Sequence, residues 1–173
     1  SLLGDQEKKI NALKLLTIED SLTGLFNSRH FYDQLDKEIK RSDRYLHPIS
    51  LAFIDVDNLK EINDSYGHKI GDKILRLIAN RIKACLRSND SAYRFAGDEF
   101  TLILPETTAS EAKFVGDRIL SKFANESFVV IDIEISKITL SIGIAEYQMN
   151  ERIQQLVHRA DLTMYEAKKR GGC

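Results

Sequence analysis

Apolar positions follow helical spacing in some stretches of the chain and strand spacing in others, and this pattern predicts the order of its elements. Phe31, Leu35 and Ile39 recur every four residues, which predicts a helix over residues 28–44. Residues 49–57 (ISLAFIDVD) form an apolar run that ends in two aspartates, and such a run is typical of a buried strand.

The middle of the chain continues in the same way. Residues 59–72 are rich in polar residues and glycine and are expected to form a loop. Isoleucines at helical spacing then predict a helix over residues 69–86. Alternating apolar residues on either side of an Ala-Gly-Asp turn predict a hairpin in residues 91–105. A helix over residues 109–125 is expected to face inward with Phe114, Val115, Ile119 and Phe123.

Two strands, 127–135 and 137–147, and a closing helix over 151–170 complete the chain. The centre is therefore a β-α-β-β-α-β unit, in which helices pack on one face of a mostly antiparallel sheet. This order predicts an α+β fold of the ferredoxin-like or palm type, with an extra hairpin and flanking helices.

Residues 6–18 place Ile10, Leu13, Leu16 and Ile18 near helical or heptad spacing. So short a helix is marginal by itself, so it is expected to pack on the domain, on a second copy or on an upstream module; a frayed start is the alternative. The pattern breaks near Glu19. We therefore divide the chain into an N-terminal linker helix, 1–18, and one domain, 19–173.

Composition narrows the possible partners. The 173 residues carry 25 basic and 26 acidic side chains, which argues against a nucleic-acid polymer as the partner. Two cysteines cannot form a disulfide framework. The apolar stretches are too short to cross a membrane, and the first residues lack the apolar core of a signal peptide. We expect a cytoplasmic location without membrane contact, including the cytoplasmic part of a membrane-bound sensor.

Acidic residues mark a candidate site. Alternation along a strand sends Asp55 and Asp57 to the same side, and Asp98 and Glu99 lie at the hairpin turn. If the strand and the hairpin are neighbours in the sheet, three or four carboxylates converge, which favours Mg²⁺ beside bound phosphates. The alternative is a set of solvated loop acids that lie apart.

The polar stretch after the strand adds groups suited to a nucleotide. Lys60 suits a phosphate oxygen. Asn63 and Asp72 form an acceptor-rich surface, and a carboxylate that accepts two N–H groups would select guanine over adenine. His68 and the glycines around it are equally consistent with a tight turn and a helix cap.

Five segments together resemble the GGDEF domain of diguanylate cyclases, from Asp20 to Gly171. They are DSLTGLFNSRHF (20–31), FIDVDNLKEINDSYGHKIGD (53–72), RFAGDEF (94–100), SIGIAEY (141–147) and ADLTMYEAKKRG (160–171). The resemblance implies condensation of two GTP molecules into cyclic di-GMP with release of two pyrophosphates. It also implies two Mg²⁺ or Mn²⁺ ions, a homodimer for catalysis and fusion to an upstream sensor domain.

The resemblance assigns roles residue by residue. The implied metal ligands are Asp55, the carbonyl of Val56, Asp98 and Glu99. The implied catalytic residues are Asp98, Glu99 and Lys60, although a metal-bound carboxylate is a poor base and the ligand role of Asp98 is the stronger one. The implied substrate-binding residues are Asn63, His68, Asp72, Gly97 and Lys168.

A second site is implied by an RxxD motif at Arg87 and Asp90, for which Arg118 aligns with a further arginine. In the family this spacing marks an inhibitory site for the product, and arginine forks suit guanine and phosphate. A surface ion pair is the alternative, because RxxD also occurs by chance.

The chain departs from the family pattern at three positions, one of which, Leu59 in place of a common phenylalanine, is a tolerable apolar exchange. Ala96 replaces the first glycine of the signature, which would cost about 1 kcal/mol if its φ were positive. Gly172 stands where an arginine is common. We expect retained activity. One alternative is a domain that binds GTP or cyclic di-GMP without catalysis; another is a nucleotidyl cyclase that acts on a single nucleotide, or a relative of palm-type polymerases.

Overall fold

The computed structural model of the chain describes residues 2–124, 127–135 and 137–171. A five-stranded sheet lies at its centre, with β2 (Ile49–Val56) between β4 and β7 and antiparallel to both. The strand order is β1 (Phe26–Asn27), β3 (Ser91–Ala96), β4 (Glu99–Pro105), β2, β7 (Leu140–Glu146). Only β1 and β3 pair in parallel among these strands. The predicted α+β fold with a mostly antiparallel sheet is confirmed.

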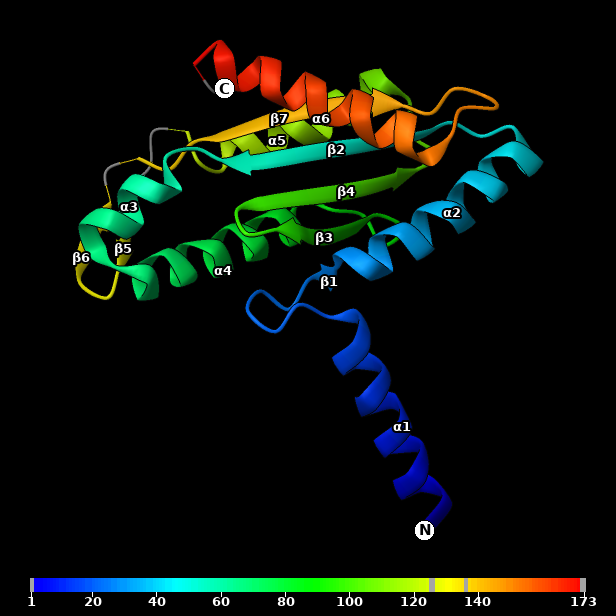
Figure 1. Cartoon of the computed structure of the whole chain (residues 1–173), viewed down its shortest axis with the longest axis horizontal. Helices are drawn as coiled ribbons and strands as arrows, with labels where there is room; N and C mark the ends of the chain where they lie inside the picture. The colour runs from blue at the N-terminus through cyan, green and yellow to red at the C-terminus, as the bar shows by residue number, and fades with distance from the viewer. Residues whose placement is uncertain (1, 125–126, 136, 172–173) are drawn as a thin grey trace.

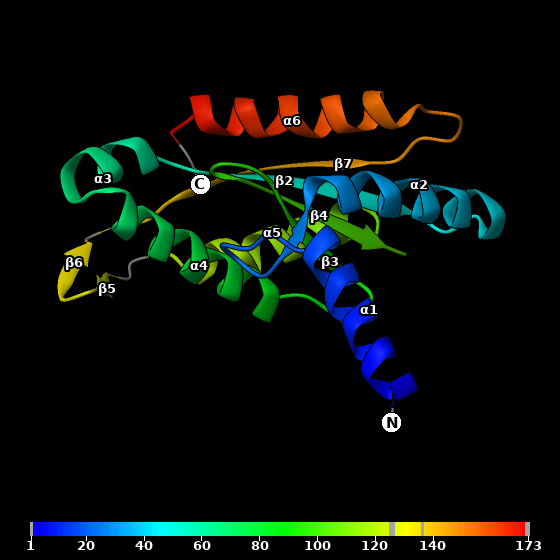
Figure 2. The same cartoon turned by 60° about the horizontal axis from the view of Figure 1, so that its bottom comes forward.

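Helices cover both faces of this sheet (Figures 1 and 2). The central unit places α4 (His68–Ala84) and α5 (Ala109–Ser121) on one face, as the pattern predicts. The flanking helices α2 (Ser28–Tyr45) and α6 (Ile153–Lys169) cover the other face. Because both faces are covered, β2 is buried along its whole length, which explains its uninterrupted apolar run.

The residues of β2 divide between two hydrophobic clusters by alternation. Leu51 and Phe53 pack with α2 and α6, whereas Ala52 and Ile54 pack with α4 and α5. Asp55 continues the first series, so its side chain emerges on the face that α6 covers.

The stretch predicted as a loop, 59–72, is helical instead. It contains α3 (Leu59–Tyr66) and the first turn of α4, separated by Gly67 at φ +89°. Leu59, Ile62 and Ile70 are the buried apolar side chains of this stretch, so α3 itself packs on the core through only two of them.

The predicted strand 127–135 is also different in the structure. It forms a separate hairpin of β5 (Phe128–Val130) and β6 (Ile133–Ile135). Ile131 and Asp132 both have positive φ, as the type I′ turn of a two-residue hairpin loop requires. Such a turn is uncommon for isoleucine, and the sequence therefore did not indicate it.

One residue of α5 that was predicted to be buried is exposed in the structure. Phe114 is 71% exposed, while Val115, Ile119 and the nearby Phe123 are buried. The buried stripe of α5 instead continues through Ala112 and Gly116, three residues before and one residue after Val115.

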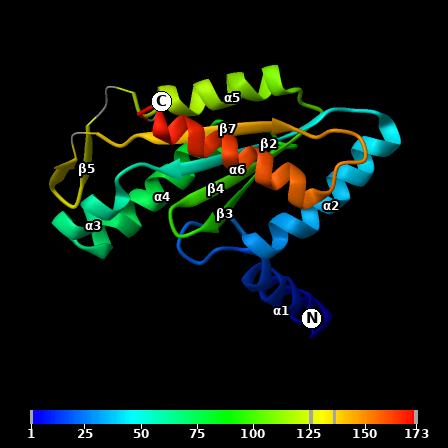
Figure 3. The same cartoon turned by 45° about the horizontal axis from the view of Figure 1, so that its top comes forward.

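Helix α1 (Leu2–Ile18) projects away from the sheet (Figures 1 and 3). Ile10 and Leu13 are exposed; the side chains of residues 14–16, Leu16 among them, lie outside the described part of the chain. The division at residue 18 stays a prediction. None of the described helices has the length and apolar character needed to span a bilayer.

Helix α6 approaches β7 through Gly143. A Cβ at this position would lie 2.0 Å from the backbone nitrogen of Met164 and 2.5 Å from the carbonyl oxygen of Ala160. The glycine therefore sets the height of α6 above the sheet, and with it the place of the residues at the end of α6.

Gly143→Ala is expected to lower the free energy of unfolding by about 3 kcal/mol, because backbone of α6 must move to admit the methyl group. Gly116→Ala is the matched control: its Cβ would meet Ile142 and Ile144 at 3.6–3.7 Å, so stability should stay within about 1 kcal/mol of the parent. Urea unfolding measures both. Equal stability of the two variants would contradict the close approach.

Candidate functional site

Strand pairing brings the candidate acids together at one end of the sheet. Asp55 of β2 lies opposite Glu99 of β4. The backbone N–H of Val56 donates to the carbonyl oxygen of Asp98, 3.1 Å away, in the turn between β3 and β4. The condition left open by the sequence, that the strand and the hairpin are neighbours in the sheet, is therefore met.

Asp55 is 6% exposed, and the two oxygens of its carboxylate have different surroundings. Its Oδ2 accepts a hydrogen bond from Nζ of Lys168, which reaches in from the last turn of α6. Its Oδ1 is buried and has no hydrogen-bond partner among the described residues. Burial raises the pKa of Asp55 above its usual value, the Lys168 ammonium opposes this, and the charges of Asp98 and Asp57 add to it.

Asp57 lies just after β2 and is also buried. Its Oδ1 accepts from the hydroxyl of Ser141 at 2.8 Å, and its backbone N–H donates to the carbonyl of Thr139 at 2.9 Å. Its Oδ2 has no partner among the described residues. Ser141 of β7 faces Asp55 across the sheet, so Ser141 fixes Asp57 beside Asp55.

Glu99 is half-buried at the start of β4. Burial raises the pKa of Glu99, and the charges of Asp55, Asp161 and Asp98 raise it further. Sequence reasoning missed Asp161. Its signal was its spacing from Lys168: seven residues are about two helical turns, so both lie on the same side of α6.

The donor set fits a divalent cation in part. Among the described residues, no three His, Cys, Asp or Glu side chains come together as a metal site, so the expected cluster of three or four ligating carboxylates is not formed. Mg²⁺, however, uses one or two protein carboxylates together with phosphates and water. The buried, unpartnered Oδ1 of Asp55 is an oxygen donor of this kind.

The predicted nucleotide-binding residues lie on α3 and α4. Asn63 on α3 is partly buried, and its Oδ1 is buried without a partner in the described part of the chain. A Cβ on Gly71 would lie 1.8 Å from this oxygen, so Asn63 occupies the space that the glycine leaves. Asp72 follows Gly71 and is exposed. This packing brings Asn63 close to the backbone beside Asp72.

Lys60 and His68 are both exposed. Lys60 lies on the first turn of α3, two residues after Asn58 with its left-handed φ of 58°, and His68 is the first residue of α4. The predicted turn and helix start around His68 are thus present in the backbone. The role of His68 in nucleotide binding stays a prediction.

The signature turn accepts its alanine without strain. Neither Ala96 nor Gly97 has a positive φ, so the cost expected for a left-handed Ala96 does not arise. Ala96 is exposed and pairs with Glu99, and a Cβ on Gly97 would meet nothing within 4 Å. The departure at Gly172 lies outside the described residues.

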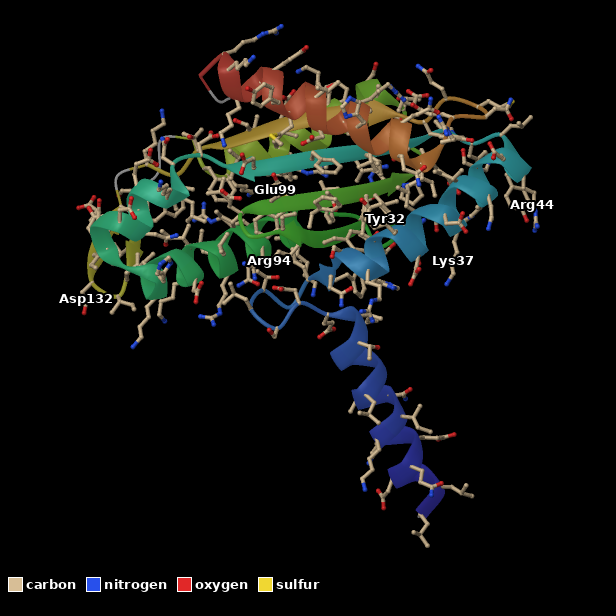
Figure 4. All side chains as sticks on the ribbon, in the orientation of Figure 1. Tyr32, Lys37, Arg44, Arg94, Glu99 and Asp132 are labelled. Carbon is tan, nitrogen blue, oxygen red and sulfur yellow. The ribbon has the colours of Figure 1, made fainter. Side chains whose placement is uncertain are left out.

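Arg94 fixes this turn, and sequence reasoning missed it. Its Nε and Nη2 donate to the carbonyl oxygen of Gly97 at 3.2 and 2.9 Å, and its Nη1 donates to Oδ1 of Asp20 at 3.3 Å. Thr23 donates to Oδ2 of Asp20 from its N–H at 2.8 Å and its hydroxyl at 2.7 Å. Figure 4 shows Arg94 between the hairpin and the loop that follows α1.

The RxxD motif closes a turn at the other end of β3. The backbone N–H of Arg87 donates to Oδ2 of Asp90 at 2.9 Å. Arg118 reaches the same place from α5, where its Nη2 donates to the carbonyl of Cys85 at 2.5 Å. Arg87 and Asp90 also line a hollow of about 340 Å³, whose other walls include Phe26 and Lys83.

The chain is similar in sequence to proteins of known family. A family model described as "Diguanylate cyclase, GGDEF domain" matches residues 17–173. The response regulator PleD of Caulobacter vibrioides is 37% identical over 158 residues, which cover 90% of this chain and 35% of PleD. Diguanylate cyclase A of Treponema denticola is 37% identical over 168 residues, which cover 94% of this chain and 45% of that protein. The chain thus spans less than half the length of these relatives.

Two solved structures have similar folds. The coiled coil and GGDEF domain of DgcB from Caulobacter crescentus, in complex with c-di-GMP, aligns with a TM-score of 0.93 at 27% identity and covers 98% of this chain and 90% of that one. Diguanylate cyclase SiaD from Pseudomonas aeruginosa, in complex with its activator SiaC, aligns with a TM-score of 0.88 at 35% identity, over 98% of this chain and 65% of SiaD.

Arg94→Met is expected to lower the free energy of unfolding by about 1–3 kcal/mol, because it removes the guanidinium donors to Oδ1 of Asp20 and to the Gly97 carbonyl. Burial pushes the pKa of Asp20 up, but the Thr23 hydroxyl and amide and the Arg94 guanidinium outweigh it and hold the pKa below its usual value. A lowered folded-state pKa stabilises the fold above about pH 4 and ceases to do so as the pH falls through the folded pKa.

The parent should therefore lose more stability between about pH 5 and pH 3 than Arg94→Met does, as measured by urea unfolding across that range. Lys40→Met removes an exposed pair with Asp36 and serves as the control, with an effect of about 0.5 kcal/mol or less. An identical acid slope for parent and Arg94→Met would contradict the role given to Arg94.

Proposed function

Because the chain belongs to the family of GGDEF-domain diguanylate cyclases, we propose that it condenses two GTP molecules into cyclic di-GMP and releases two pyrophosphates. The observation that carries the proposal is the buried Asp55 carboxylate, which the pairing of β2 and β4 holds beside the signature turn. Both the curated relatives and the solved structures include proteins named as diguanylate cyclases.

We propose Mg²⁺ or Mn²⁺, two ions per site, as the cofactor. Asp55, the carbonyl of Val56 and Asp98 would hold them, with Glu99 contributing to the second ion. Such ions screen a triphosphate and lower the pKa of an attacking hydroxyl. The orphan Oδ1 of Asp55 supports this assignment, since a buried oxygen without a donor favours a cation.

The substrate would lie between the signature turn and α3. Gly97 leaves open space at the turn, so a phosphate can approach its backbone. Lys60 and Lys168 would bind phosphate oxygens as point charges. Asn63 and Asp72 would read guanine, with His68 beside the substrate. The unpartnered Oδ1 of Asn63 supports this, because guanine offers the N–H donors that it lacks.

Each domain would hold one GTP, and each 3′-hydroxyl would attack the α-phosphate of the other nucleotide. Catalysis then requires two domains face to face, in a homodimer. The projecting helix α1 is suited to set how often two copies meet, on behalf of an upstream sensor.

Cyclic di-GMP would inhibit the enzyme by binding at Arg87, Asp90 and Arg118. Two contacts support this assignment: Asp90 closes the turn that begins at Arg87, and the Arg118 guanidinium binds the carbonyl of Cys85, two residues before Arg87. Residues 91–96 of β3 lie between this turn and the signature, about 17–20 Å of extended chain. The product would thus bind away from the catalytic acids.

We expect purified protein with GTP and Mg²⁺ to form cyclic di-GMP, at a rate that rises more than linearly with protein concentration, as followed by liquid chromatography. Asp98→Ala should lower the rate by about 10²–10³-fold. Its fold should be retained, because the bond to the Val56 N–H uses the backbone carbonyl of residue 98. Absence of product from the parent at high concentration would contradict the proposal, and so would product formed from ATP alone.

Arg87→Ala is expected to make the reaction insensitive to added cyclic di-GMP, because the proposed product site loses one of its guanidinium groups. Initial rates at increasing product concentration measure this. Arg44→Ala on the exposed face of α2 is the control for loss of positive charge and should remain inhibited. Unchanged inhibition in Arg87→Ala would discard the inhibitory site.

A further inference from the structure

One lysine and one aspartate meet at the centre of the site. Lys168 projects from the last turn of α6 and pairs with Oδ2 of Asp55. The two partners differ in exposure: the Asp55 side chain is 8% exposed and the Lys168 side chain is 44% exposed. Asp55 is held in β2, whereas Lys168 can leave by rotation of its side chain.

The charges around this pair are predominantly acidic. The hydrogen bond to Asp55 raises the pKa of Lys168, and the charges of Asp57 and Asp98 raise it further. Asp57 lies beside Asp55 with an unpartnered oxygen of its own. Buried carboxylates are costly without a counter-ion, so Lys168 stabilises this cluster.

The same two groups have other partners in the proposed reaction. A divalent cation would bind Asp55, and a phosphate would bind Lys168. A divalent cation and an ammonium that share one carboxylate repel each other. The ion pair between Lys168 and Asp55 is therefore weaker while a cation is bound to Asp55.

We propose that Lys168 is an internal counter-ion that competes with the divalent cation for Asp55, so that cation binding releases the lysine toward the phosphates. This inference rests on the proposed function for the existence of a cation at Asp55. It adds an order of events: the site is charge-balanced before the cation arrives, and the lysine becomes available for a phosphate when the cation takes its place.

The test measures the binding of Mn²⁺ alone to the full chain without nucleotide, by electron paramagnetic resonance of free Mn²⁺. Lys168→Met removes the competitor and keeps a side chain of similar length. Lys169→Met is the matched control: it removes the same charge from the next residue, whose ammonium lies 4.6 Å from the ring centre of Tyr165. Lys168→Arg keeps a cation at the position.

Lys168→Met should bind Mn²⁺ about tenfold more tightly than the parent, which corresponds to loss of an ion pair of about 1.4 kcal/mol. Lys169→Met and Lys168→Arg should stay within about twofold of the parent. Binding that appears in Lys168→Met and is too weak to detect in the parent also supports the competition. Equal Mn²⁺ affinity in Lys168→Met and the parent overturns it, and so does the absence of binding in both.

Thermal unfolding gives a second measurement. Without Mn²⁺, Lys168→Met should melt below Lys169→Met, because the acids lose their counter-ion, and saturating Mn²⁺ should close this gap. A gap that Mn²⁺ does not change would overturn the proposal. Neither measurement uses GTP. Failure here together with normal synthesis of cyclic di-GMP would reject the competition alone, whereas failure of synthesis would reject the proposed function.

Discussion

The pairing of β2 with its two neighbours is the constraint on which the rest of the structure depends. Burial on both faces fixes the register of β2, because a shift of one residue would exchange the side chains that face α6 with those that face α4. That register places Asp55 opposite Glu99 and Ser141. Packing of the apolar core thus buries two neighbouring carboxylates, and Lys168 and Ser141 offset part of the free-energy cost of that burial.

The site is assembled from segments far apart in the chain, and each is held by a short-range contact. Arg94 ties the signature turn to the loop after α1, and Gly143 lets α6 approach closely enough for Lys168 to reach Asp55. Arg94 therefore connects the loop that follows α1 with the turn that carries the acids.

Much of the fold followed from spacing, and the errors have identifiable causes. The helix α3 was predicted as a loop because only Leu59 and Ile62 mark its buried side. The hairpin of β5 and β6 was missed because Ile131 and Asp132 adopt a turn that usually takes Gly or Asn. Phe114 was placed inside because hydrophobic character by itself does not require burial.

For the site, the sequence by itself determined which chemical groups are available: acids at the end of one strand and in one turn, a lysine in the polar stretch after that strand, and a lysine in the closing helix. It could not determine which of these groups meet, because contacts between β2, β4 and α6 depend on strand pairing and helix height. Only the tertiary structure decided that Lys168 binds Asp55, that Ser141 holds Asp57 and that Ala96 is unstrained. The physical reason is that charge pairing and backbone conformation are set by neighbours distant in sequence.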